Sequence, residues 1–504
     1  AKLQSLDPKD GQVLLARGRV ELRSGQADKA LEFLNTAQNL AIEVNNEELK
    51  ANVLQAMGNG YYALHRLEDA LRSFQDSLAL KQKLGLKRGA AASLGSIASL
   101  QVDLGKPDEA LKNYNESLKL SREIGDTAGV ANSLIDLGSF YVNRNQPDKA
   151  LPLFKESLQM LIDLGDDPTR SLVLSNIGNI YLGQGDSQEA HTFYDQALQL
   201  MEKSGATDAL PVTLHNLAET DAALGLYDQA VERYHNALDL QRKSDNKQGI
   251  ALETSGLGTI YGLQGRYGAA LSAKEEAVKL LRDINDQTIS MVDVLGGYGN
   301  ALAAVRRTDD ARKNLQDALQ LARNLKDSDR IAMILGYLGD NAFYAGDLAN
   351  ARQFYNQAAQ SAAHSSDRGV VLATKFNLAR LAADQGRAAE AISALNAINA
   401  EAGKTGPKFL ATQSAVWLGR SYLAAKNPKK AQEVLQAAVL QAEKLGLQGL
   451  KAQGHALQAA ALRALGKTSE ADAEAKAAAQ IFSQIQSEAH FDPRTRHDFT
   501  TGIS

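Results

Sequence analysis

One residue type recurs along this chain at almost constant spacing. An alanine appears every 40 residues, with a single 41-residue step, at Ala30, Ala70, Ala110, Ala150, Ala190, Ala230, Ala270, Ala311, Ala351, Ala391, Ala431 and Ala471. Twelve residues before each of these alanines stands a second small residue, either glycine or alanine. Self-similarity of this length is typical of stacked-repeat architectures. Length alone would suggest about three domains, but the unbroken period predicts one array of twelve repeats.

Each repeat contains two amphipathic stretches separated by a short turn. In the fourth repeat, one helix face at the i, i+3, i+4, i+7 spacing is formed by Leu134, Leu137, Gly138 and Tyr141. A second helical stripe consists of Ala150, Phe154 and Ser157. Residues 145–148 between them (Asn-Gln-Pro-Asp) combine turn residues with a helix start. We name the two helices of a repeat helix A and helix B, and the sequence predicts an all-α fold built from such hairpins.

The small residues indicate where helices cross closely, because helix axes approach to about 8 Å only where the side chains at the crossing are small. Bulky residues of helix B are expected to fill the space beside them, at Phe74, Tyr114, Phe154, Tyr194, Tyr234 and Tyr355. The residue before the helix A small position is apolar in the ten inner repeats but is Arg17 in the first and Gln458 in the last. The polar residue at this position in the first and last repeats predicts that these two repeats are caps whose outer faces contact water. We therefore expect a continuous array over 1–482, followed by a short helical extension and flexible tail over 483–504.

Segments such as 131–158 (ANSLIDLGSFYVNRNQPDKALPLFKESL) and 171–198 resemble tetratricopeptide repeats, and the resemblance covers nearly the whole chain. The added loop residues, as in 121–126 (SREIGD), resemble the 40-residue variant of Pins-type and kinesin-light-chain-type scaffolds and of bacterial regulatory arrays. The large aromatic residue that the family places at the start of helix A is absent here, and a leucine usually stands nearby. The resemblance implies a right-handed α-solenoid, or superhelix, whose helix A residues line a concave groove for a peptide or a partner helix.

Composition and charge disfavour several classes of function. The chain has 55 Lys and Arg against 59 Asp and Glu with no long run of either sign, whereas nucleic-acid binding needs a concentrated basic surface. The absence of cysteine removes disulfides and thiolate chemistry. The eight histidines lack metal-ligand spacing, and the stretch 461–468 (ALRALGKT) lacks the first glycine of a phosphate loop. No stretch is apolar enough for a membrane span. We expect no enzymatic activity, no cofactor, no metal and no nucleic-acid partner.

Helix A residues that the core does not use are the candidates for the groove. In the fourth to sixth repeats these are Asn132, Asp136, Ser139, Ser175, Asn176, Asn179, His215, Asn216 and Glu219, and the same slot in other repeats holds Asn59 and Asn300. An asparagine side chain donates and accepts at once, so a ladder of asparagines one repeat apart could hold an extended segment by its main chain. The alternative is that these side chains face water or bond across to adjacent helices.

A second candidate patch is basic. Arg380 and Arg420 fall in the later groove slot one repeat apart, and with Asn377 and Trp417 they would favour an acidic segment. The alternative is that both arginines are ordinary solvated charges. The run 296–299 (GGYG) inside a helix A predicts a local hinge, because glycine loosens a helix.

Two hypotheses about function follow. The first is a non-enzymatic scaffold that binds a peptide segment or partner helix in its concave groove, centred on the third to seventh repeats. The second is the ligand-sensing part of a larger bacterial signalling enzyme, such as a kinase, ATPase or protease fusion, cut before Ala1. We expect a cytoplasmic location, with export or membrane tethering left open because the chain begins at Ala1 rather than at Met.

Overall fold

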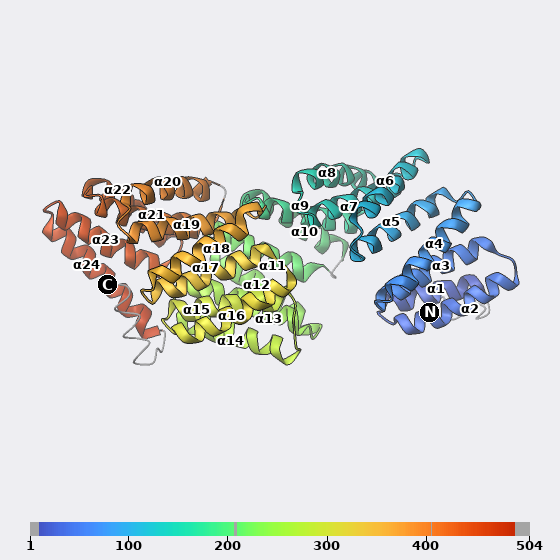
Figure 1. Cartoon of the computed structure of the whole chain (residues 1–504), viewed down its shortest axis with the longest axis horizontal. Helices are drawn as coiled ribbons and strands as arrows, with labels where there is room; N and C mark the ends of the chain where they lie inside the picture. The colour runs from blue at the N-terminus through green and yellow to red at the C-terminus, as the bar shows by residue number, and fades with distance from the viewer. Residues whose placement is uncertain (1–9, 206–208, 405, 489–504) are drawn as a thin grey trace. The chain divides into compact units, whose positions relative to one another are not determined.

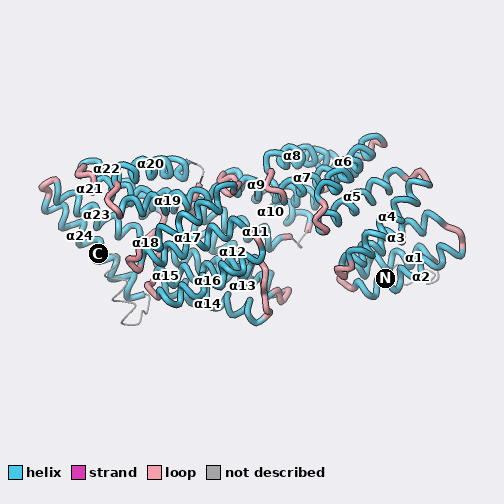
Figure 2. The backbone as a smooth tube through the Cα atoms, in the orientation of Figure 1, coloured by secondary structure: helices cyan, strands magenta, loops and turns pink. Residues whose placement is uncertain are grey.

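The computed structural model describes residues 10–205, 209–404 and 406–488. Within these ranges the regular elements are helices, and Figure 2 shows helices and connecting loops without a strand. The predicted all-α solenoid is thus confirmed. Of the tail expected over 483–504, the first residues continue the last helix as far as Glu488, and 489–504 lie outside the described residues.

The chain separates into two compact units, Ala1–Val173 and Leu174–Ser504, which we call unit 1 and unit 2. The boundary falls within α9 (Asp167–Gly183), although the sequence period continues across it. The helices of unit 1 before this boundary are α1 (Gly11–Arg23), α2 (Ala27–Glu43), α3 (Glu47–Ala63), α4 (Leu67–Lys83), α5 (Lys87–Asp103), α6 (Pro107–Glu123), α7 (Thr127–Asn143) and α8 (Pro147–Leu164).

Unit 2 runs from green to red in Figure 1. Its helices after α9 are α10 (Ser187–Ser204), α11 (Leu210–Leu224), α12 (Tyr227–Lys243), α13 (Lys247–Leu263), α14 (Tyr267–Asp283), α15 (Ile289–Ala304), α16 (Thr308–Leu325), α17 (Ser328–Tyr344), α18 (Leu348–Ser361), α19 (Arg368–Asp384), α20 (Ala388–Lys404), α21 (Lys408–Ala424), α22 (Pro428–Lys444), α23 (Gln448–Ala464) and α24 (Thr468–Glu488). A short 3-10 helix, η2 (Ala362–His364), follows α18.

Odd-numbered helices are helix A of a repeat and even-numbered helices are helix B. From α1 to α8 and from α10 to α24, each helix packs against the next one in the chain. Helix A of one repeat also contacts helix A of the next, as α13, α15, α17, α19, α21 and α23 do. Each of the twelve recurrent alanines is at most 2% exposed. None of these alanines points into solvent, as the prediction of stacked hairpins requires.

The small residue of helix A accommodates a large side chain of helix B from the same repeat. A Cβ added at Gly58 would lie 2.4 Å from the ring of Phe74, and one added at Gly339 would lie 2.3 Å from the ring of Tyr355. The partner side chain stands four residues after the recurrent alanine in both repeats. Glycine is needed at these positions because any side chain would displace the ring that fills the hairpin.

A single left-handed residue ends most helices. After α1, Gly25 has a φ of 73°, its N–H donates to the Leu22 carbonyl over 3.1 Å, and the Gln26 N–H donates to the Glu21 carbonyl over 2.9 Å. These two bonds form the Schellman motif, which satisfies carbonyls at the end of a helix. Eight described turns use a residue other than glycine, among them Asn145 and Lys426. The turns predicted from the sequence are therefore confirmed.

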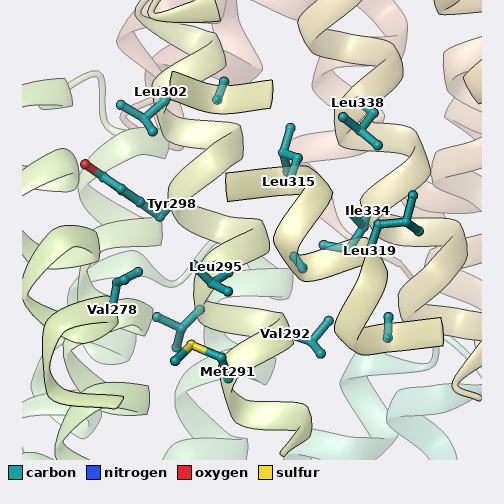
Figure 3. Close-up of a cluster of buried hydrophobic side chains, with 14 of the residues drawn as sticks. Val278, Met291, Val292, Leu295, Tyr298, Leu302, Leu315, Leu319, Ile334 and Leu338 are labelled. Atoms are coloured by element: carbon teal, nitrogen blue, oxygen red, sulfur yellow. The ribbon is translucent and has the colours of Figure 1, made fainter. Parts of the chain in front are cut away.

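Neighbouring repeats share one apolar core. Figure 3 shows Leu295 and Leu302 of α15 beside Leu315 of α16 and Ile334 and Leu338 of α17. All five side chains are buried. Full burial of one such side chain contributes about 1.5–3 kcal/mol, so the contact between neighbouring repeats contributes to the stability of each.

Within unit 2, turns of the superhelix touch one another. A Cβ added at Gly185 would lie 2.9 Å from Arg368 Cβ, one added at Gly225 would lie 3.6 Å from Lys408 Cβ, and one added at Gly265 would lie 3.3 Å from Gln448 Cβ. The two residues of each pair are 183 residues apart. One apolar cluster spans this contact and includes Tyr227, Leu257, Leu445, Leu447 and Leu450. Each of these three tight turns thus packs against the first residue of a helix A that lies about four and a half repeats later in the chain.

The expectation of a water-exposed residue at Gln458 in the final repeat is wrong. Gln458, predicted to give a wettable cap, is 7% exposed, because α24 packs on α23 in the way that helix B packs on helix A in the inner repeats. Within the described ranges, no helix combines the length and the apolar character that a membrane crossing requires.

Candidate functional site

Unit 2 contains a cavity of about 1190 Å³, which we call the lumen. Its wall is formed mainly by α13, α15, α17, α19, α21 and α23, which are helix A of the seventh to twelfth repeats. The contacts between superhelical turns hold these helices around it. The sequence predicted a groove centred on the third to seventh repeats, whereas this cavity is lined by residues of the seventh to twelfth repeats.

The wall of the lumen carries more positive than negative charge. Its cationic side chains are Lys274, Arg306, Arg380 and Arg420, and its acidic side chains are Asp340 and Asp384. Arg420 Nη2 donates to Asp384 Oδ1 over 2.8 Å, and Arg380 forms an ion pair with Asp340. Both acids are thus engaged by arginines, which leaves the surplus positive.

Arg380 is buried, and its charge is paired within the protein. It is 2% exposed, and its guanidinium bonds to Asp340 and to the Tyr355 hydroxyl. The guanidinium carbon lies 4.6 Å from the centre of the Phe343 ring and 5.9 Å from that of Trp417. Burial alone would lower the pKa of Arg380, but Asp340 outweighs it and raises the pKa above its ordinary value. Arg380 does line the lumen, but the expectation that its charge is available to an acidic segment is corrected by these contacts.

Arg420 agrees better than Arg380 with the predicted basic patch. Its side chain is 47% exposed on the lumen wall, and its guanidinium carbon lies 4.7 Å from the centre of the Trp417 ring. Stacking on an aromatic face holds a guanidinium in place while leaving its edges open to other partners. Arg420 and Trp417 therefore form one polar and aromatic corner of the lumen.

Two predicted asparagines line the lumen without a hydrogen bond to another described residue. Asn300 on α15 and Asn377 on α19 are half-buried in its wall. Among the described residues, neither side chain has a hydrogen-bond partner. Each amide offers two donors and a carbonyl acceptor, and such groups usually find partners when they are buried.

A recurring contact explains which groove residues are open. In some repeats the helix B residue four positions after the recurrent alanine is a tyrosine. Its hydroxyl donates a hydrogen bond to the helix A residue that stands fifteen positions earlier. The Tyr194 hydroxyl donates to Asn179 over 2.6 Å, and the Tyr355 hydroxyl donates to Asp340 over 2.8 Å. Where helix B instead carries an apolar residue, as at Leu315, the slot has no such partner. Asn300 is open for this reason, as are Asn59 and Ser139, which stand fifteen residues before Phe74 and Phe154.

The middle of the predicted ladder bonds within the protein. Asn216 Nδ2 donates to Asn179 Oδ1 over 3.1 Å, and the hydroxyls of Ser175 and Thr213 lie 3.4 Å apart. These contacts join adjacent helix A elements, which is the alternative that the sequence left open. Asn176 is half-buried beside them and, like them, does not line the lumen.

His215 belongs to an ionic cluster next to this ladder. Its Nδ1 lies 2.9 Å from Glu253 Oε2 and its Nε2 lies 3.6 Å from Glu219 Oε1. Burial alone would lower the pKa of His215, but the contacts with Glu219 and Glu253 raise it to about 10. The imidazolium therefore ties α11 to α13 at neutral pH, and neither His215 nor Glu219 lines the lumen.

The predicted residues of unit 1 form a separate set. Asn59 and Asn132 are exposed, while Asp136 and Ser139 are half-buried. Burial raises the pKa of Asp136 to about 6. None of the four belongs to the lumen of unit 2.

Lys274 is a lumen residue that the sequence predictions missed. It stands four residues after Ala270, where the other repeats have Leu, Phe or Tyr, or Ala in the last. Lys274 is 6% exposed, and its Nζ donates to Thr259 Oγ1 over 2.6 Å and to Ser255 Oγ over 3.0 Å. Alignment of the twelve repeats on their alanines would have revealed this break in the pattern.

Neither a metal centre nor a phosphate loop is formed by the described residues. No group of three potential His, Asp or Glu ligands gathers within those ranges. The stretch 461–468 lies at the end of α23 and in the following turn. A helix C-terminus presents carbonyls, which do not cradle phosphate.

Hairpins of two helices, stacked with their helix A elements inward, define this chain as a tetratricopeptide-repeat solenoid. The tetratricopeptide-repeat family matches residues 11–83, 89–163 and 137–203. The family described as the MalT-like TPR region matches residues 212–481, more than half of the chain, so the chain belongs to the MalT-like TPR family.

Among solved structures, the chain resembles a Rap protein complexed with competence and sporulation factor, at 15% identity and a TM-score of 0.53, covering 71% of this chain and 99% of the Rap chain. It also resembles the apo form of the quorum sensor NprR from B. thuringiensis, at 16% identity and a TM-score of 0.48, covering 62% of this chain and 87% of the other. The Rap structure shares the fold. No curated protein matches the chain by sequence.

Proposed function

We propose that the protein is a binding scaffold that holds an extended segment of a partner protein inside the lumen of unit 2. The observation that supports this most is a cavity of about 1190 Å³ lined by six consecutive helix A elements. Sites for small molecules usually occupy about 300–1,000 Å³. The lumen is larger than that range, and its length over six repeats suits a chain segment.

The wall offers the contacts that a peptide requires. The amides of Asn300 and Asn377 can each donate to a main-chain carbonyl and accept from a main-chain N–H. Tyr337, Phe343 and Trp417 provide apolar surface on the same wall. Main-chain bonds of this kind give affinity with little demand on sequence, and pockets for side chains add selectivity.

The similar fold of the Rap structure supports this arrangement indirectly. That protein is recorded in complex with competence and sporulation factor, so a solenoid of this class can hold a bound factor. The identity of 15% limits the comparison to the fold, and the proposal for this chain depends on its own lumen residues.

The test replaces the two open amides. The full chain carrying Asn300→Ala and Asn377→Ala is immobilised and exposed to a synthetic pool of hexapeptides with randomised side chains, and the retained peptides are counted by mass spectrometry. Each lost hydrogen bond removes about 0.5–1.5 kcal/mol, so we expect retention to fall about tenfold. The helical circular-dichroism signal should not change, because neither side chain packs in the core.

A matched control replaces Asn324 and Asn356 by alanine. Both are exposed on helix B elements, α16 and α18, outside the lumen. This control should retain peptides as the wild type does. Equal retention by the lumen variant and the wild type would contradict the proposal. Loss of retention after Asn59→Ala with Asn132→Ala instead would place the site in unit 1.

A further inference from the structure

Lys274 occupies a position built for an apolar side chain. In the first, eighth and eleventh repeats a leucine fills the same place against a glycine of helix A, as Leu34, Leu315 and Leu435 do. The stem of Lys274 lies in that place too, with its Cγ 3.2 Å from a Cβ added at Gly258. The ammonium group then continues beyond the packed hairpin to the lumen wall, where Thr259 receives it.

Gly297 leaves the ammonium open to the lumen. A Cβ added at Gly297 would lie 2.8 Å from Lys274 Nζ, and both residues line the lumen. The predicted hinge at 296–299 is not formed, because α15 continues through these residues as a helix. The glycines instead make room for neighbours: Gly296 for Ile334, Gly297 for Lys274 and Gly299 for Leu315.

The charge of Lys274 is not neutralised inside the protein. Among the described residues no carboxylate forms an ion pair with it, and its two hydrogen-bond partners are neutral hydroxyls. An ammonium has three donors, so one remains unassigned. Burial lowers the pKa of Lys274 to about 8, although the fields of Asp293 and Glu219 act in the opposite direction. Buried charges in proteins are normally paired, so an ammonium with neutral hydroxyl partners favours an anionic ligand.

We propose that Lys274, with the hydroxyls of Thr259 and Ser255, binds a carboxylate of the partner segment held in the lumen. This inference depends on the proposed function and adds the chemistry of the ligand to it. One ammonium next to hydroxyl groups matches a singly charged carboxylate, and the positive surplus of the lumen wall favours the same sign. Lys274 reaches this site from a core position of helix B.

The carboxylate can come from an acidic side chain or from the end of a chain, and four peptide pools distinguish these sources. The pools are random hexapeptides with a free C-terminus, the same pool amidated, a free pool without Asp and Glu, and an amidated pool without Asp and Glu. Each is passed over the immobilised full chain, and the retained peptide is quantified by mass spectrometry. We expect the wild type to retain the carboxylate-free pool about tenfold less than the complete pool, since charge-assisted hydrogen bonds are among the strongest. The intermediate pools show which carboxylate contributes.

Two variants and one control connect this preference to Lys274. Lys274→Leu should abolish the discrimination between pools. Gly297→Ala keeps the charge but covers the ammonium with a methyl group, and it should weaken the discrimination without removing a core side chain. Lys81→Leu is the control, because Lys81 is also buried and forms no ion pair with any described residue. Lys81 bonds to Gln55 and Ser93 and does not line the lumen. Its discrimination should match that of the wild type.

The outcomes separate the two proposals. If the wild type retains peptides but holds the carboxylate-free pool equally well, the carboxylate site is wrong and the scaffold function stands. Full discrimination by both Lys274→Leu and Gly297→Ala would also overturn the site. If the wild type retains no peptide from any pool, the scaffold function fails and the carboxylate site fails with it.

Discussion

Arg380 and Lys274 are both buried cations in the wall of the lumen, and their surroundings differ. Arg380 has a carboxylate partner in Asp340 and several aromatic rings around it, so its charge stabilises the inner wall. Lys274 has only hydroxyl partners in the described structure. At the scale of single residues, the partner of a buried charge therefore decides whether that residue is structural or available to a ligand.

The first prediction concerns the cost of Lys274 to the fold. Burial holds its pKa near 8 against an ordinary 10.5, and a difference of this size corresponds to about 3 kcal/mol. The folded protein therefore disfavours the charged form at pH 7, and Lys274→Leu should slow amide hydrogen exchange in α13, α14 and α15. Leucine fits because Leu34 fills the same place in the first repeat.

The stabilisation expected from Lys274→Leu should decrease as the pH rises. A lowered lysine pKa means that the unfolded chain binds more protons between pH 8 and 10.5, so the wild type gains stability as the pH rises through that range. The advantage of the leucine variant should be complete below pH 8 and should disappear toward pH 10.5. Faster exchange in the variant at pH 7 would contradict this account of Lys274.

At the scale of elements, the helices follow from local sequence. The apolar stripes, the small residues and the left-handed turn residues specify each hairpin independently of the rest, and all these features are visible in the sequence. Which groove slots stay open is less local, because it depends on the side chain fifteen residues later. A tyrosine there occupies the slot, as Tyr194 does with Asn179, whereas Leu315 leaves Asn300 open.

The second prediction compares the turns at the two ends of α22. Lys426, just before it, has a φ of 55°, and Gly446, just after it, has a φ of 69° with open space around its Cα. A residue with a Cβ is strained in this region by roughly 1 kcal/mol. Lys426→Gly should raise the midpoint of thermal unfolding and Gly446→Ala should lower it. Shifts of the same sign in both variants would argue against turn strain as the cause.

At the scale of the whole molecule, unit 2 is held together by contacts between distant parts of its own chain. The lumen of unit 2 depends on contacts between residues 183 positions apart, such as Gly225 with Lys408. No pattern within a single repeat encodes that register, because it results from small rotations added over four and a half repeats. The sequence therefore predicted the hairpins and several lumen residues, including Asn300 and Asn377, but not where the lumen forms.

The third prediction tests these contacts between turns. Leu445, the residue that follows α22, is 9% exposed because it packs against Tyr227 and its neighbours. Ile284 follows α14 in the same position and is 38% exposed. Leu445→Asp should separate the turns, accelerate hydrogen exchange in α12 and α22, and weaken peptide retention severalfold, since a charge would be buried there. Ile284→Asp should leave these properties unchanged. Equal behaviour of the two variants would show that the contact does not support the lumen.

The central claim is that the lumen of unit 2 is the binding site. Hydrogen–deuterium exchange of the full chain, measured with and without the free random hexapeptide pool, tests it most directly. We expect slower exchange in α15, α17, α19 and α21, with the helices of unit 1 unchanged. Protection confined to α3 and α7, or protection that persists after Asn300→Ala with Asn377→Ala, would contradict the claim.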